Sequence, residues 1–166
     1  MTKLLVLSLM VTTFLCAAAQ ADSIDITLTE STLTGSGGGT LTFYATLTNV
    51  TNGTICLNGD SFATSSVLLT LNDNPFLKNA PMSLAAGQSS SPFEIFQVFI
   101  APGTPPGTYA FNTFTILGGA SDTAFDVMGS TNFAVAVSPV PEPSTLLLLG
   151  AGLVGLALKK QYQQRD

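Results

Sequence analysis

The chain has 166 residues, with 9% charged residues, a formal net charge of −5, and no His or Trp. A nucleic-acid surface needs clustered Lys and Arg, and this chain has only five such residues, so its composition argues against nucleic acid as a partner. Without His, neither a Ser-His triad nor a His-ligated zinc site is possible, so we expect no enzymatic activity and no cofactor.

The N-terminal residues 1–21 have the layout of a secretory signal peptide. A basic start at Lys3 is followed by an apolar centre and by small residues ending at Ala21. Cleavage before Asp22 fits this layout, and cleavage after Ala19 remains an alternative. A lipoprotein reading of Cys16 is disfavoured, because Leu15 is bulky where a small residue is required.

Residues 22–137 show β patterning. Apolar and polar residues alternate over 24–29 and 40–48, which predicts half-buried strands. Further strands are predicted near 54–57, 66–71, 93–100, 108–116 and 132–137, and no helical period of useful length occurs. We therefore expect an all-β domain, a single immunoglobulin-like β-sandwich of about seven strands.

Turn residues separate the predicted strands. Asn52-Gly53 is a two-residue hairpin signal, and Pro105-Pro106-Gly107 directs the chain into the penultimate strand. Tyr109, at the entrance of that strand, is either a tyrosine corner or an ordinary core aromatic. Cys56 is left without an intramolecular thiol partner once residues 1–21 are removed, and a role as a small buried hydrophobe is expected.

Two sets of side chains are weak candidates for chemistry. Asn58, Asp60, Asn72 and Asp73 carry oxygens of the kind that Ca²⁺ prefers, but their spacing matches no known loop, and turns use the same residues. We therefore expect no metal site. Asp122 and Asp126 are a still weaker pair for glycoside hydrolysis, and a solvated loop is the better account.

Residues 138–166 divide into three parts: a proline-rich linker, an apolar segment predicted as a short transmembrane helix over 145–158, and a basic end. The prolines remove amide donors and favour an extended linker. An apolar run of this length rises only about 21 Å as a helix, against a hydrocarbon core of roughly 30 Å. The basic cluster consists of Lys159, Lys160 and Arg165. Basic residues that flank a span stay on the cytoplasmic side, which places the body outside.

This C-terminal arrangement resembles the PEP-CTERM sorting signal of Gram-negative bacteria. The proposed motif residues are Val140, Pro141, Glu142, Pro143, Ser144 and Thr145. The resemblance implies recognition and processing by the membrane enzyme exosortase. One departure is the Lys-Lys end, where the family is usually Arg-rich. The alternative is an ordinary single-pass anchor after a proline-rich linker.

The body also resembles small PEP-CTERM proteins that have one β-sandwich ectodomain. The likeness rests on stretches such as Gly39-Thr-Leu-Thr-Phe43 and Ala101-Pro-Gly-Thr-Pro-Pro-Gly-Thr-Tyr109. It implies no activity. Gly150-Ala-Gly-Leu-Val-Gly155 matches the letters of a dinucleotide fingerprint, but the chain ends too soon for the second strand, so helix packing is the better interpretation.

Together these features predict an exported noncatalytic protein of the cell surface or exopolysaccharide matrix. It would pass transiently through the inner membrane, with exosortase and possible exopolysaccharide as partners. The alternative is a glycan-binding or adhesion module, for which Tyr44 and Phe99 would have to form an exposed flat patch.

Overall fold

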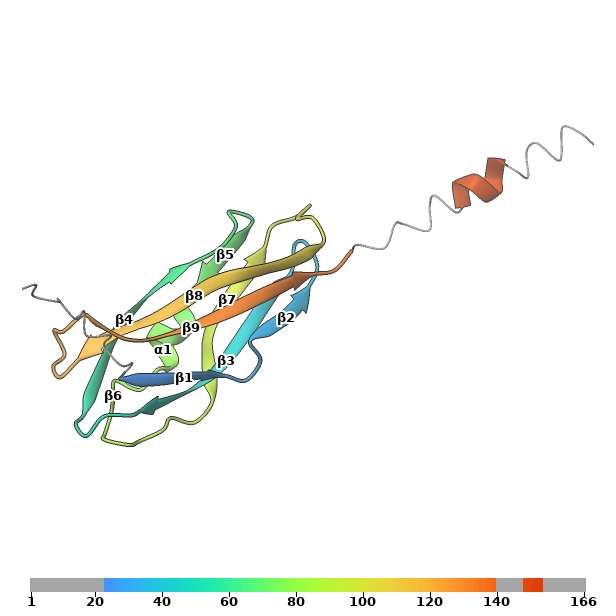
Figure 1. Cartoon of the computed structure of the whole chain (residues 1–166). Helices are drawn as coiled ribbons and strands as arrows, with labels where there is room; N and C mark the ends of the chain where they lie inside the picture. The colour runs from blue at the N-terminus through green and yellow to red at the C-terminus, as the bar shows by residue number, and fades with distance from the viewer. Residues whose placement is uncertain (1–22, 140–147, 154–166) are drawn as a thin grey trace, which may run out of the picture.

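The computed structural model describes residues 23–139 and 148–153, and the first of these ranges folds as two packed β-sheets (Figure 1). One sheet has the order β1-β3-β7-β5 and the other the order β2-β9-β8-β4-β6. The all-β, two-sheet expectation is confirmed. The strands are β1 (Ile24–Leu28), β2 (Thr32–Gly35), β3 (Thr40–Asn49), β4 (Ile55–Ala63), β5 (Leu69–Asn72), β6 (Ser83–Leu84), β7 (Phe93–Ile100), β8 (Gly107–Gly119) and β9 (Asp126–Val137).

The described part contains nine strands instead of about seven. The two additional strands are β2 and β6, which have four and two residues. Neither is long enough to show a clear alternation of apolar and polar residues. β2 pairs in parallel with β9, whereas the other strand pairs are antiparallel. The more detailed immunoglobulin-like assignment stays a prediction.

The connection 50–54 is not the predicted hairpin loop. β3 and β4 belong to different sheets, so this connection crosses between the sheets. Asn49, which is fully buried, closes it: its Nδ2 donates to the Gly53 carbonyl at 2.7 Å and to the Leu84 carbonyl at 2.9 Å, and its Oδ1 accepts from the Thr51 amide at 2.9 Å. The buried amide of Asn49 therefore stabilises a connection whose Asn52-Gly53 sequence would also fit a hairpin.

A short helix, α1 (Asn74–Asn79), was not predicted. It has only six residues, too few to show a helical period, although Pro75 in its first turn is a position that helices favour. Its Phe76 is buried and contacts Phe114 of β8 edge to face, with ring centroids 5.8 Å apart. The helix, which lies between β5 and β6 in the chain, thus covers part of the core beside β7.

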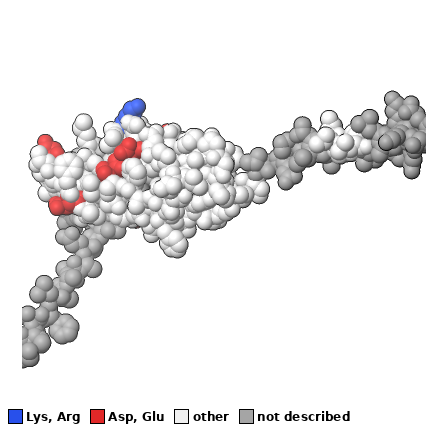
Figure 2. Space-filling view, turned by 90° about the horizontal axis from the view of Figure 1, so that it is seen from above, with Lys and Arg blue, Asp and Glu red and all other residues white. Residues whose placement is uncertain are grey.

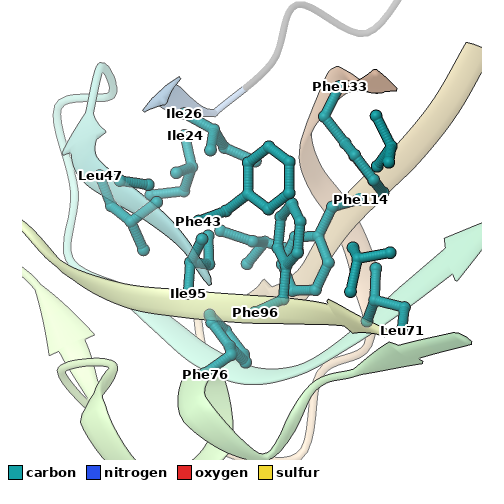
Figure 3. Packing of buried hydrophobic residues seen from close by; sticks show 14 of the residues in the cluster. Ile24, Ile26, Phe43, Leu47, Leu71, Phe76, Ile95, Phe96, Phe114 and Phe133 are labelled. Atoms are coloured by element: carbon teal, nitrogen blue, oxygen red, sulfur yellow. The ribbon is translucent and has the colours of Figure 1, made fainter. Parts of the chain in front are cut away.

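Stacked phenylalanines occupy the centre of the core (Figure 3). Phe96 of β7 lies 4.8 Å from Phe43 of β3, 4.9 Å from Phe114 of β8 and 4.7 Å from Phe133 of β9, measured between ring centroids. These rings come from both sheets, so one aromatic cluster joins the two layers. Aromatic pairs at such distances stabilise a core beyond the area that they bury.

Tyr109 makes the bond that a tyrosine corner requires. Its hydroxyl donates to the Pro105 carbonyl at 3.0 Å, four residues upstream, at the start of β8. Its ring also packs against the hydrophobic core. The residue therefore combines the two roles that its sequence context left open.

Candidate functional site

The end of β9 and the first residue of the tail are paired with neighbouring strands through their backbones. Val137 pairs with Gly107 of β8 and with Gly35 of β2, and the Ser138 amide donates to the Gly35 carbonyl at 2.8 Å. Pro139 is exposed and has no amide hydrogen, so it cannot continue this ladder. The last backbone hydrogen bond of the strand ladder is therefore made by Ser138, one residue before Pro139.

All of the predicted sorting residues lie outside the described ranges. These are Val140, Pro141, Glu142, Pro143, Ser144 and Thr145 of the motif, together with Lys159, Lys160 and Arg165 of the basic cluster. Residues 148–153 are helical, inside the helix predicted over 145–158, and Leu148, Leu149 and Leu153 are exposed. Within 23–139 and 148–153, no helix is long and apolar enough to cross a membrane.

The two amides among the four Ca²⁺ candidates, Asn58 and Asn72, each bond to other groups of the protein. Asn58 donates through Nδ2 to the carbonyls of Ser121 and Ala124, both at 2.8 Å, and so holds the connection between β8 and β9. Asn72 accepts at Oδ1 from the side-chain amide of Asn74 at 2.7 Å. These contacts give both amides local structural roles.

Asp60 and Asp73 do interact. Burial, and to a lesser extent the negative charge of Asp73, together raise the pKa of Asp60 to about 6. The Asp60 Oδ2 atom is shielded from solvent and has no hydrogen-bond partner among the described residues. Over those same residues, no three His, Cys, Asp or Glu side chains converge on a common metal position.

Asp122 and Asp126 are both exposed at the connection between β8 and β9. Asp126 begins β9 and pairs with Gly118 through its backbone. Cys56 is half-buried on β4 and is a free thiol. Asp122 thus lies on an exposed loop and Asp126 at the exposed start of β9, whereas the Cys56 thiol is less enclosed than a core residue.

Tyr44 and Phe99 share the outer face of the four-stranded sheet but form no single platform. They are 48% and 40% exposed. Phe99 pairs with Thr40, four residues from Tyr44 along β3, and this offset corresponds to about 14 Å along the strand. The polar side chain of Gln97 lies on the same face between them, where its Nε2 donates to Glu94 Oε1 at 2.6 Å.

Sequence reasoning named Asn72 but missed the group of amides that gathers with it beside this face. A shallow pocket of about 290 Å³ lies between α1 and the edge of the sheet. Its lining residues are Asn72, Asn74, Pro75, Lys78, Asn79, Glu94 and Gln97. The amides are spread over 26 residues of sequence, from position 72 to position 97, and only the packing of α1 beside β7 brings them together.

Comparison with known protein families supports the tail assignment. Residues 139–161 match the PEP-CTERM protein-sorting motif. A comparison with curated proteins finds no match. The motif implies exosortase-dependent sorting of an extracellular or surface protein. The chain therefore carries a PEP-CTERM protein-sorting motif directly after a small all-β domain.

Proposed function

We propose that this protein is a noncatalytic component of the cell surface or exopolysaccharide matrix of a Gram-negative bacterium, released from a transient inner-membrane anchor by exosortase. The observation that carries the proposal is the position of the motif. The last ladder bond of the body is made by Ser138, and the matched motif begins at residue 139. A processing enzyme can therefore reach the motif without unfolding the sandwich.

The residue inventory supports a noncatalytic role. The chain has no His, and its half-buried Cys56 therefore has no imidazole to activate it. Asp122 lies exposed in the connection between β8 and β9, and Asp126 lies exposed at the start of β9. The outer face of the five-stranded sheet instead carries hydroxyl groups, such as the Thr115 and Ser130 pair at 2.9 Å, which suit a hydrated matrix.

The proline-rich motif provides the test. Replacing Pro141 and Pro143 with Ala relaxes the extended backbone, and Glu142→Ala removes the charge between them. We expect both variants to be exported but to accumulate unprocessed in the inner membrane. Membrane fractionation with an antibody to the sandwich, and intact-mass measurement of the recovered protein, would detect this. The wild-type protein should start near Asp22 and lack the residues after about Ser144.

Pro139→Ala is the matched control, because it changes a proline of the same linker and leaves Pro141, Glu142 and Pro143 intact. It should be processed like the wild type. Normal release of both motif variants would show that these residues form only a linker. A wild-type product that retains Tyr162 would remove exosortase processing from the account.

The second candidate function is glycan binding, and the outer face of the four-stranded sheet favours it. Two exposed aromatic rings, Tyr44 and Phe99, lie on either side of polar side chains that border the amide-lined pocket. Aromatic faces and amides are common ligands of sugars, although here the rings are separated. The absence of one continuous platform keeps this function second.

Exopolysaccharide from the producing cells, titrated against the protein, tests this candidate. If the face binds sugar, the Tyr44→Ala, Phe99→Ala double variant should lose at least about tenfold in affinity, which corresponds to about 1.4 kcal/mol. Phe125→Ala, which removes an exposed aromatic ring elsewhere, should bind like the wild type. Equal binding by all three proteins would exclude this face as the glycan site.

A further inference from the structure

The C-terminal tail leaves the sandwich at one end, where β9 finishes. Three connections meet there with the end of β9: residues 36–39, 64–68 and 101–106. The Gly38 amide donates to the Ile100 carbonyl at 2.8 Å, and the Ala101 amide donates to the Leu68 carbonyl at 2.9 Å. We call these three connections, with the adjoining residues 107–112 of β8, the tail end.

The tail end carries no charged side chain. The described residues include eight charged ones: Asp25, Glu30, Asp60, Asp73, Lys78, Glu94, Asp122 and Asp126. None of them belongs to the three connections or to residues 107–112. Figure 2 shows the same separation, with acidic groups gathered away from the side where the C-terminal chain emerges and uncharged atoms covering that side.

Two large apolar side chains protrude from the tail end. Val67, in the connection between β4 and β5, is 97% exposed, and Phe111, at a bulge of β8, is 90% exposed. A hydrogen-bonded contact holds the two segments together, since Asn112 Oδ1 accepts from the Ser65 amide at 2.8 Å and from the Ser65 hydroxyl at 3.0 Å. Neither side chain contributes to the core.

Phe111 is also held in a costly backbone conformation. Its φ is +64°, and among the described residues it is the only non-glycine with a positive φ. Asn112 maintains this geometry, because its Nδ2 donates to the Tyr109 carbonyl at 2.8 Å and to the Phe133 carbonyl at 3.1 Å. Such strain persists where the surroundings enforce it, and it is often associated with function.

The tail limits how far this end can lie from a membrane that holds the apolar segment. Eight residues lie between Pro139 and Leu148, and even fully extended the nine residue-to-residue steps span only about 30 Å. The tail end is therefore the part of the body nearest to the bilayer before processing. The surface that faces the lipid is uncharged and carries the two protruding apolar groups.

We propose that Val67 and Phe111 insert into the interfacial region of the lipid bilayer that holds the tail. This inference rests on the proposed function, because it requires the tail to be membrane-held. A stable protein partner buries roughly 800 Å² per side in a packed patch, whereas these are single protruding side chains, which a fluid interface accepts more readily. The charged groups of the body, seven acidic and one basic, point elsewhere, which reduces repulsion from anionic lipid.

The natural absence of Trp makes a direct test possible. Phe111→Trp and Val67→Trp each introduce a single fluorophore at the tail end, and Met82→Trp, at a residue that is 89% exposed beside β6 at the opposite end, is the matched control. Each full chain is reconstituted into phosphatidylcholine–phosphatidylglycerol vesicles with and without brominated acyl chains. Flotation establishes whether the chain is membrane-bound, and intact mass establishes its termini.

We expect the Phe111→Trp and Val67→Trp proteins to emit at shorter wavelength and to lose emission in brominated lipid, while Met82→Trp does neither. If the protein floats with the vesicles but none of the three Trp variants shows the wavelength shift or the quenching, the inference is overturned and the sorting role is left intact. A shift of Trp emission to shorter wavelength that grows with the protein-to-lipid ratio but is unaffected by brominated lipid would indicate contact with a second copy of the chain. Quenching only in the presence of exosortase would indicate contact with that enzyme. Either result overturns the inference. If the full chain does not float with the vesicles, the tail does not hold the protein on a membrane, and both proposals are contradicted.

Discussion

Asp60 lies on β4 with one carboxylate oxygen shielded from solvent and without a hydrogen-bond partner among the described residues. Burial, and secondarily the charge of Asp73, raises the pKa of Asp60 from 3.8 to about 6. The folded protein therefore binds this proton more tightly than the unfolded chain does. The stabilising contribution is complete below pH 3.8 and is lost as the pH rises through about 6.

Asp60→Asn should therefore remove part of the pH dependence of stability. The wild type should lose thermal stability between about pH 4 and about pH 7 relative to the variant, because only the wild type must bury a charge at the higher pH. Thermal unfolding followed by circular dichroism at the two pH values measures this difference. Asp122→Asn, which removes an exposed loop carboxylate, should leave the pH dependence unchanged. An equal loss in the Asp60→Asn protein would assign the effect to other groups.

At the scale of elements, the contact between β1 and β9 joins the two sheets. The Ser23 amide donates to the Met128 carbonyl at 2.7 Å, while Ile24 pairs with Asn49 of β3 in the other sheet. Gly129 permits this approach, since a methyl group at its Cα would overlap the Ile24 carbonyl. The first strand is thereby held against both layers.

Gly129→Ala should separate β1 from β9 and lower the free energy of unfolding by about 1–3 kcal/mol, the usual cost of overpacking. Urea unfolding of the purified protein measures the loss. Gly53→Ala is the matched control, because a methyl group there meets no atom within 4 Å, and it should change stability by less than about 0.5 kcal/mol. Equal stability of the two variants would show that β1 shifts without cost.

At the scale of the whole molecule, charge and tail are arranged along one direction. The body ends at an uncharged surface, and the sorting motif begins one residue after its last ladder bond. The charged side chains lie away from this end, and Asp122 lies in the connection between β8 and β9. In the view of Figure 2, the acidic groups gather away from the side where the C-terminal chain emerges. In the proposed membrane-held state, this polarity would orient the body with its solvent-exposed carboxylates away from anionic lipid.

The sequence alone was enough for those features whose signals are local. Alternation of apolar and polar residues located β1 and β3 within about one residue, the strand predicted near 93–100 matches β7, and the proline-rich triad followed by an apolar segment located the sorting motif. A strand that faces the core on one side shows its period in its own residues. A sorting signal read as an extended peptide is likewise local by nature.

Tertiary structure decided the features that depend on pairing between distant residues. β2 and β6 are too short to show a period, and α1 has less than two turns, so packing against their neighbours selects these elements. The crossing of residues 50–54 between sheets depends on buried Asn49 bonding to Leu84. The positive φ of Phe111 depends on Asn112 bonding across to Phe133, and the uncharged tail end depends on three connections meeting in space. No pattern within a single stretch of sequence encodes such contacts, because their free energy arises only when both partners are brought together by the fold.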